Sequence, residues 1–354
     1  MDREIEFLNA PSAEERLANL KTLLSEEKEK PAVLPQYANN HIHTTFSFSP
    51  YSPTAAVWAA RRAGLPTAGI MDHDSISGAS EFRKAAAMAG VGSTCGVEMR
   101  TDWSKTPFSR VHTNNPDQPG VTYMTFHSIR ERYFDQTRDM IAPFREHRNE
   151  RNRKMLVAIE NATGIHLDFD EDVLPLSEYK NGGSVTERHL LFALAKKVLP
   201  EGSEDEQYKL LGQYKAGLIH DVYINPTDEL IPLDFAIDYA KQVDAYLCYP
   251  YLGDVTASPT GDKKAQKFED DYLDDLFEFF KKAGLKAVTY MPSRNTPAQL
   301  DRLIKLCDKY SMRQISGEDI NSPSQSFICT QLADPKFAHL VDAAWERVRR
   351  EENG

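Results

Sequence analysis

The chain has 354 residues, of which 42 are basic and 53 acidic, and its net charge is −11. This acidic balance argues against a broad surface for nucleic-acid polymers, although it leaves room for a local basic pocket. The composition, 41% hydrophobic and 27% charged, is that of a globular protein, and no apolar run approaches the roughly 18 to 20 residues that span a bilayer. The N-terminus is charged, unlike a secretory signal, and the four cysteines form no C-x-x-C pair. We expect a cytoplasmic protein without membrane partners, in which nitrogen and oxygen would hold any metal.

The N-terminal region, residues 1–37, predicts a polar helical arm with a thin stripe of leucines. From about residue 40, short apolar runs alternate with helical segments, which is typical of parallel strands joined by helices. The first such runs predict strands at His41, 67–71, 94–99 and 121–127, with helices that begin at Ser52-Pro53 and near Ser77.

The strand pattern then stops, and residues 131–235 give mostly helical signals, including 189–198. It resumes with strands at 245–249, 286–291 and 313–316, separated by helices at 272–283 and from Thr296 onward. We therefore expect an α/β protein with seven strands. Its main body comprises residues 38–130 and 236–354, and residues 131–235 form an inserted helical subdomain.

Reactive side chains follow several of these strands: His41 and His43, Asp72-His73-Asp74, Glu98, His127 and Glu318-Asp319. In a β/α barrel the carboxyl ends of the strands converge, so such residues gather there. The two histidines of the H-x-H pair point to one face of a strand with Cα atoms about 7 Å apart, close enough to reach one metal ion. Carboxylates beside them would complete a mixed nitrogen and oxygen set suited to zinc, manganese or iron.

Each of these residues also has a structural explanation when it is taken alone. A single H-x-H pair is common on exposed strands. Asp74 and Ser75 compete as the cap of the next helix, and Glu98 can be a solvated strand end. His127 can be a core histidine with satisfied hydrogen bonds. Their coincidence at strand ends favours a metal site.

Four short motifs in this order resemble the PHP family (polymerase and histidinol phosphatase), and within it the free-standing metal-dependent phosphoesterases. They are His41-Ile42-His43-Thr44, Met71-Asp72-His73-Asp74, Gly96-Val97-Glu98 and Gly317-Glu318-Asp319. Weaker similarity lies at 125–127, 145–155, 163–165 and 187–189, so that the resemblance covers about residues 38–325. It implies a distorted (β/α)7 TIM-like barrel that binds up to three divalent ions, with 131–235 as a lid.

The resemblance implies a first metal site formed by His41, His43, Glu98 and Asp319, and all four residues are present. A second site would share Glu98 as a bridge. We therefore expect one or two ions per chain, of zinc, manganese or iron.

The second site would also use His127 and Tyr249, which stands where the family has a histidine and can ligate as a phenolate or leave the position to water. A third site would need ligands where this chain has Phe48, His73 and Asn321, so we expect it to be lost.

The resulting prediction is a metal-dependent hydrolase, most simply a phosphoesterase acting on a small phosphorylated metabolite or nucleotide through a metal-bound hydroxide. We expect His73, with Asp72 beside it, to be catalytic, His73 as general acid to the leaving group. Substrate-binding residues are predicted at Arg188, His189, Arg294 and Asn321, although a structural role is equally open for Arg294.

For Arg145, Arg148 and Arg151 we favour a solvated helix face, paired with Glu146 and Glu150. The competing hypothesis for the whole chain is a barrel with an eroded metal site that acts as a non-catalytic ligand- or metal-binding protein. A nuclease or polymerase accessory is disfavoured by the acidic charge and by the lack of an attached polymerase region.

Overall fold

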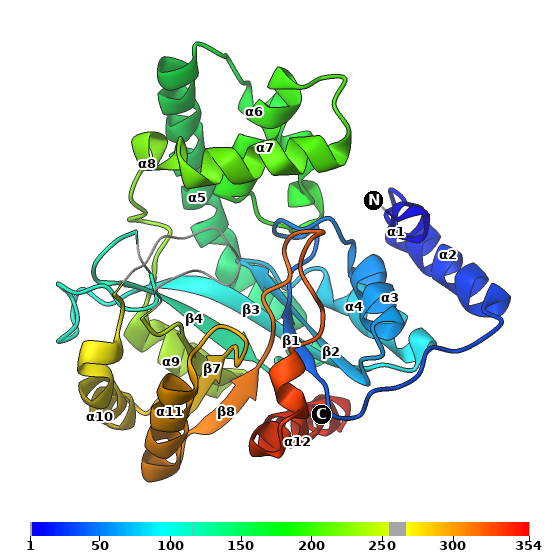
Figure 1. Ribbon diagram of the computed structural model, residues 1–354. Helices are drawn as coiled ribbons and strands as arrows, with labels where there is room; N and C mark the ends of the chain where they lie inside the picture. Colours follow the sequence, from blue (N-terminus) through cyan, green and yellow to red (C-terminus); the bar gives the residue numbers. More distant parts are fainter. Residues whose placement is uncertain (1, 116, 255–266, 354) are drawn as a thin grey trace.

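A curled sheet forms the centre of the protein in the computed structural model, which describes residues 2–115, 117–254 and 267–353 (Figure 1). The strands follow the order β1-β2-β3-β4-β6-β7-β8, and β5 pairs with β3. Their bounds are β1 Asn39–Ile42, β2 Thr67–His73, β3 Gly92–Asp102, β4 Val121–His127, β5 Ile231–Pro232, β6 Tyr246–Tyr251, β7 Ala287–Tyr290 and β8 Arg313–Ser316. The backbone N–H of Ile320 donates to the carbonyl of His41, and its carbonyl accepts from the N–H of His43, which joins the segment after β8 back to β1. Strands lie at the seven predicted places, and the short β5 was not predicted.

One strand departs from the expected parallel arrangement. β4 pairs antiparallel with both β3 and β6, whereas β2 is parallel to β1 and β3, and β7 is parallel to β6 and β8. The carboxyl end of β4 therefore lies toward the opposite end of the sheet from the carboxyl ends of its parallel neighbours. This reversal decides which predicted residues reach the site.

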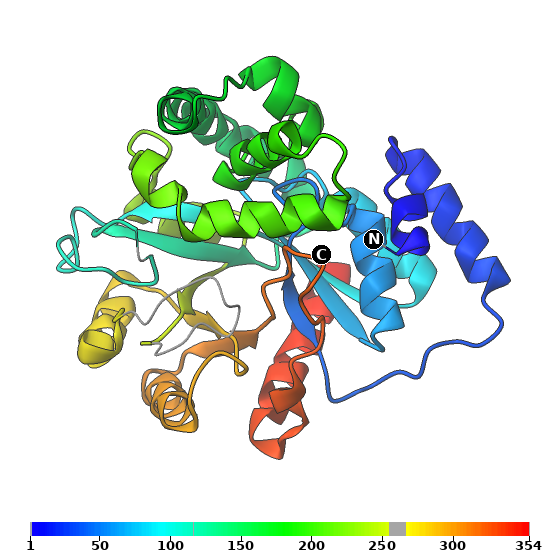
Figure 2. The same ribbon diagram turned by 45° about the horizontal axis from the view of Figure 1, so that its top comes forward.

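Helices cover the sheet and extend beyond one end of it (Figures 1 and 2). Their bounds are α1 Arg3–Leu8, α2 Ala13–Glu26, α3 Pro53–Arg62, α4 Ala79–Ala89, α5 Phe134–Thr163, α6 Glu187–Val198, α7 Glu204–Ala216, α8 Ile219–Val222, α9 Leu233–Gln242, α10 Leu273–Ala283, α11 Pro297–Tyr310 and α12 Ala338–Glu352. Helices α5 to α8 gather together at one end, and α1 and α2 lie beside α3 and α4. In the described residues, no helix combines the length and apolarity that a membrane crossing requires.

Local signals explain several helix ends. Ser52 caps α3 by accepting a hydrogen bond from the backbone N–H of Ala55, and Pro53 occupies the first helical position, as predicted. Gly90 ends α4 in the left-handed conformation with φ of 69°. The two predicted caps of α4 are both wrong, because α4 begins only at Ala79, after Gly78, which forms no side-chain cap.

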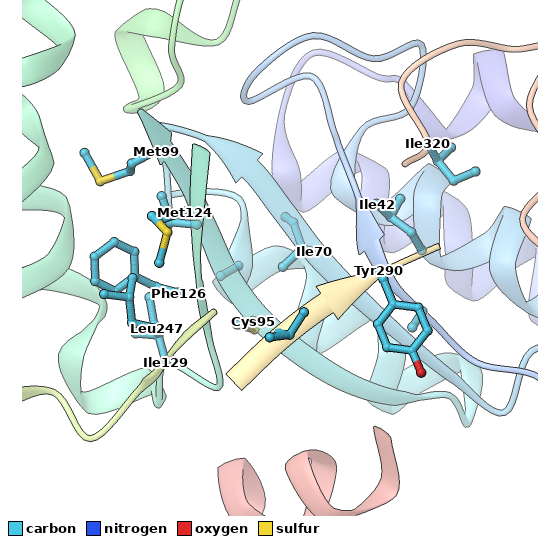
Figure 3. Close-up of a cluster of buried hydrophobic side chains, with 14 of the residues drawn as sticks. Ile42, Ile70, Cys95, Met99, Met124, Phe126, Ile129, Leu247, Tyr290 and Ile320 are labelled. Carbon is cyan, nitrogen blue, oxygen red and sulfur yellow. The ribbon is translucent and has the colours of Figure 1, made fainter. Parts of the chain in front are cut away.

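Two large apolar clusters, with a small third one of Cys248, Ala287 and Ile315, hold these layers together. The larger one lies between the sheet and its outer helices and includes Met124, Phe126 and Leu247 from neighbouring strands (Figure 3). The second lies within α5 to α8, and Phe48 from the loop after β1 inserts into it. Phe48 contacts the rings of His189 and Phe192 there, with ring centroids 4.9 and 5.8 Å apart. The loop after β1 is thereby fixed to the helices above it.

Candidate metal centre

The carboxylate of Glu98 lies at the centre of a cluster of imidazoles. Its Oε2 is 3.3 Å from Nε2 of His41, 3.3 Å from Nδ1 of His73 and 3.7 Å from Nε2 of His43. These side chains come from β1 and its end, β2 and β3, and His73 pairs directly with Glu98 in the register of β2 and β3. From the segment after β8, Asp319 places Oδ1 3.2 Å from Nε2 of His43. The structure thus brings together His41, His43, Glu98 and Asp319, which come from three distant segments of the sequence, and His73 with them.

The surrounding imidazoles keep these carboxyl groups ionised. Burial alone would raise the pKa of Glu98, but its interactions with His73, His41 and His43 outweigh burial and lower that pKa to about 2. Burial also opposes ionisation of Asp319, yet the adjacent His43, together with His41, holds its pKa well below the usual range. The pKa of His41 is raised, because the nearby Glu98 outweighs the effect of burial. The cluster therefore presents ionised carboxylates to imidazole nitrogens.

The donor set fits a divalent metal ion. His41, His43 and Asp319 offer ligand atoms that all lie within 4.8 Å of one another, and so do His43, His73 and Glu98. His43 belongs to both groups, so the two share one imidazole. Nitrogen and carboxylate oxygen donors of this kind suit zinc, manganese or iron.

His43 is oriented by a hydrogen-bonded chain that ends at Asp72. The carboxylate of Asp72 accepts bonds from the Oγ of Ser47 at 2.6 Å and from the backbone N–H and Oγ1 of Thr44 at 2.6 and 2.7 Å. Since the Ser47 hydroxyl donates its proton to Asp72, its oxygen accepts from Nδ1–H of His43 at 3.3 Å. In that tautomer Nε2 of His43, which faces Asp319 and Glu98, is unprotonated and can bind a metal ion.

The predicted catalytic residue Asp72 therefore orients His43 rather than facing the cluster itself. Asp72 precedes His73 on β2, so it points to the opposite face of the strand, where its bonds go to the loop after β1. Burial raises the pKa of Asp72, while His43 and the bonds from Ser47 and Thr44 counter that rise. Sequence reasoning missed Ser47 and Thr44, whose only signal was their place directly after the H-x-H pair.

His127 lies apart from Glu98 but within electrostatic range of His41, and its role as a metal ligand stays a prediction. β4 is antiparallel, so His127 lies opposite Gly96 while Glu98 lies opposite Thr125. This places His127 two residues, or about 7 Å, further toward the other end of the sheet. It belongs to neither group of potential ligands among the described residues. Burial lowers the pKa of its imidazole well below the usual value, and the charge of Arg347 adds to this effect.

Tyr249, predicted as a possible ligand, points away from the cluster. Its neighbour Cys248 is opposite Thr125, on the inner face that carries Glu98, so Tyr249 points to the outer face of the sheet. Its ring packs there against Phe280 and Trp103, with centroids 4.8 and 6.0 Å apart. Burial raises the pKa of this phenol well above its usual value, so it stays neutral.

Two of the predicted substrate-binding residues lie beside the cluster. Asn321 donates from Nδ2 to Oδ1 of Asp319 at 2.6 Å, so it orients that carboxylate. Arg188, near the start of α6, is half-buried and lies close enough to lower the pKa of Asp319. Its positive charge therefore acts at the cluster.

The other two have structural partners. Nδ1 of His189 accepts a hydrogen bond from the backbone N–H of Thr186 at 2.9 Å, which caps α6. Burial lowers the pKa of His189 to about 3, so its ring is neutral. Arg294 donates from Nε to the carbonyl of Leu252 at 3.3 Å and so fixes that loop. We therefore do not retain either residue as a substrate contact.

A buried network of ion pairs joins the helices α5 and α6 to the sheet. It is made of Arg100, Arg148, Arg151, Asp74, Glu187 and Glu229. Arg148 pairs with Asp74, directly after β2, and with Glu187 at 2.9 Å. The expected solvated face of α5 is thus wrong, because the partners of these arginines come from distant segments rather than from α5. Sequence reasoning missed Arg100, Glu187 and Glu229, since pairs so far apart leave no local pattern.

The fold and the cluster together define an α/β protein with a candidate metal centre at the carboxyl ends of its parallel strands. The profile of the PHP domain matches residues 39–285, which is more than half of the chain, so this protein belongs to the PHP domain family.

Two solved structures resemble this fold at low sequence identity. An amidohydrolase from Chromobacterium violaceum, solved with bound sulfate and no metal, is 18% identical, with a TM-score of 0.59 over 82% of this chain and 89% of that one. A candidate metal-dependent phosphoesterase from Bifidobacterium adolescentis is 19% identical, with a TM-score of 0.59 over 88% and 98% of the two chains.

A 63-residue segment is 38% identical to a 5'-3' exoribonuclease of Haemophilus influenzae. It makes up 18% of this chain and 23% of that protein, so the match spans less than a quarter of the relative.

Proposed function

We propose that this protein is a metal-dependent phosphoesterase that hydrolyses a small phosphorylated metabolite or nucleotide. The observation that carries the proposal is the convergence of three imidazoles on one oxygen of Glu98, with Asp319 beside them. In this proposal the sheet is a distorted (β/α)7 barrel, residues 1–37 are an arm on it, and residues 131–235 form the lid over the cluster.

His41, His43, Glu98 and Asp319 would hold the ion. A divalent ion bound there supplies a Lewis acid that makes water acidic enough to attack near neutral pH and that offsets charge on the phosphoryl group. His73 fits the role of a further ligand better than that of a general acid. Burial lowers the pKa of His73 well below its usual value, so the ring carries no proton to give at neutral pH.

Arg188 would meet the phosphoryl oxygens. An arginine donates two parallel N–H groups to such an anion, and these charge-assisted bonds are stronger than neutral ones. The guanidinium already lies within electrostatic range of Asp319, at the boundary between the cluster and the helical lid. Arg188→Ala should therefore raise KM about 10-fold or more, because one charge-assisted contact with the substrate is lost. The metal content of this variant should not change. As a control, Arg138→Ala on the exposed face of α5 should leave KM unchanged.

A second candidate function is metal or ligand binding without catalysis. It is favoured by Phe48 and Tyr249, which are buried in apolar surroundings at two places where the family has ligands. Because these two positions offer no ligand atom to the cluster, the binding protein would hold a single ion. Measured turnover separates the two candidates, because only the hydrolase releases product.

The test is metal content together with hydrolysis of a substrate panel. The panel holds phosphomonoesters, nucleotides and, because of the match to an exoribonuclease, short 5'-phosphorylated oligoribonucleotides. The wild type should retain one ion per chain and release phosphate or nucleotide, whereas Glu98→Gln should lose both properties. His166→Ala, a change at an exposed histidine after α5, is the matched control. Metal retention without turnover on the whole panel would favour the binding protein, and full activity of Glu98→Gln would refute the proposed site.

A further inference from the structure

The backbone turns directly after β2, beside the metal centre. Asp74, the residue that follows His73, has φ of 49°, in the left-handed region that few non-glycine residues adopt. Its N–H donates to the carbonyl of Glu98 on β3 at 2.9 Å. His73 lies opposite Glu98 in this strand pair, and its Nδ1 is 3.3 Å from Oε2 of Glu98. The turn at Asp74 therefore fixes the end of β2, and with it the direction of the His73 imidazole.

An arginine of α5 holds this turn by its side chain. Nη1 of Arg148 donates to Oδ2 of Asp74, and Nη2 donates to Glu187, the first residue of α6, at 2.9 Å. Asp74 and Arg148 are both buried. Burial raises the pKa of Asp74, and the charge of Arg148 counters that rise. Because an ion pair excluded from water is only weakly screened, this contact is a strong restraint on the turn.

The loop before α6 adds contacts to the residues on either side of Asp74. The buried Oγ of Ser184 donates to the carbonyl of His73 at 2.6 Å. The Oγ of Ser75 donates to the carbonyl of Gly182 at 2.8 Å. The turn is thus held between the sheet on one side and the helices α5 and α6 on the other, so a displacement of these helices would move it.

We infer that Arg148 is a positioning residue for His73. Through Asp74 it holds the left-handed turn that directs His73 toward Glu98, and the docking of α5 and α6 on the sheet thereby tunes the affinity of the cluster for a metal ion. The consequence for the ion rests on the proposed function, which takes this cluster to be a metal centre. Arg148 itself contacts neither the ion nor the substrate and acts only through Asp74 and His73.

Arg151 offers a matched control for Arg148. It lies three residues further along α5, is similarly buried, and pairs with the same Glu187. Its other carboxylate partner is Glu229, whereas that of Arg148 is Asp74. Arg148→Met and Arg151→Met therefore both break the buried network and should both lower stability. Only Arg148→Met releases the turn after β2.

Metal affinity, measured by chelator competition on the folded variants, separates positioning from stability. Arg148→Met and Asp74→Ala should each bind zinc or manganese about 10- to 100-fold more weakly, as when an outer partner of a metal ligand is removed. The double variant should lose no more than Asp74→Ala alone, because both changes act through one contact. Arg151→Met should keep the affinity of the wild type.

Asp74→Asn is the conservative variant. Asparagine tolerates the left-handed conformation, and its amide oxygen can still accept a hydrogen bond from Arg148, so this variant should bind the ion as the wild type does. If Arg148→Met does not fold, the two variants of Asp74 decide in its place. Equal affinities of Asp74→Ala and Asp74→Asn would then overturn the inference.

Hydrogen exchange in the metal-free protein keeps this inference separate from the proposed function. The N–H of Asp74 should exchange about 10-fold faster in Arg148→Met than in Arg151→Met, because its bond to Glu98 opens more often. Equal rates in the two variants would contradict the positioning role, and so would equal affinities where the wild type binds an ion. A wild type that binds no ion but shows the difference in exchange would instead refute the proposed function and leave His73 positioned by Arg148.

Discussion

Removing one hydroxyl group should weaken the metal centre without touching a ligand. Ser47 links Asp72 to His43, with oxygen–oxygen and oxygen–nitrogen distances of 2.6 and 3.3 Å. In Ser47→Ala, Nδ1 of His43 loses its acceptor and the imidazole can take the other tautomer, which puts a proton on the nitrogen that faces Asp319. Removal of such an outer partner typically costs about 10- to 100-fold in metal affinity, or roughly 1.4–2.7 kcal/mol. We expect the same loss here.

Competition with a chromophoric chelator for zinc or manganese measures this affinity, and imidazole nitrogen shifts report the tautomer of His43 in the metal-free protein. Ser49→Ala is the matched control, because Ser49 is a buried serine of the same loop whose hydroxyl accepts from the backbone N–H of Tyr51 and forms no hydrogen bond to His43 or Asp72 within the described residues. Its metal affinity should equal that of the wild type. Equal affinity in Ser47→Ala, with the imidazole shifts of His43 unchanged, would refute the orienting chain from Asp72.

Three further predictions concern other parts of the molecule. Glu187→Gln should destabilise the protein by about 3–5 kcal/mol in denaturant titration, since it leaves three buried arginines without their shared carboxylate. Asp170→Asn, which changes an exposed ion pair, should leave the denaturation midpoint unchanged. Burial raises the pKa of Glu269 to about 8, so the folded state binds more protons than the unfolded state between about pH 4.5 and 8. The free energy of unfolding should therefore decrease as the pH rises through that range. In Glu269→Gln this decrease should be smaller. Tyr249→Phe should keep the full metal content, whereas His73→Ala should lower it, and a reversed pattern by elemental analysis would contradict the assigned ligand set.

The predicted residues lie together where strands run in the common direction and apart where one does not. His41 and Glu98 belong to parallel strands and His43 directly follows the first of them, so their order along the chain was enough to place them at one edge. For His127 the same rule failed, because β4 returns as the second strand of a hairpin and its end lies at the other edge. Nothing in the apolar run of β4 distinguishes the two directions.

The side chain of Tyr249 lies away from the cluster for a related reason. A strand alternates its side chains between two faces, so a shift by a single residue moves a side chain from the cluster to the outer aromatic layer. A motif match fixes a position in the sequence to within a residue or so, which is too coarse to choose the face.

The sequence by itself determined the local structure and the composition of the metal centre. Caps such as Ser52-Pro53, a left-handed glycine at the end of α4 and the spacing of the H-x-H pair act over a few residues, so they can be read directly. Only the tertiary structure decided the direction of β4, the partners of Arg148 and the left-handed turn at Asp74. Each of these depends on segments that are distant in the sequence, and burial, which sets the energy of a charge, exists only after those segments have packed.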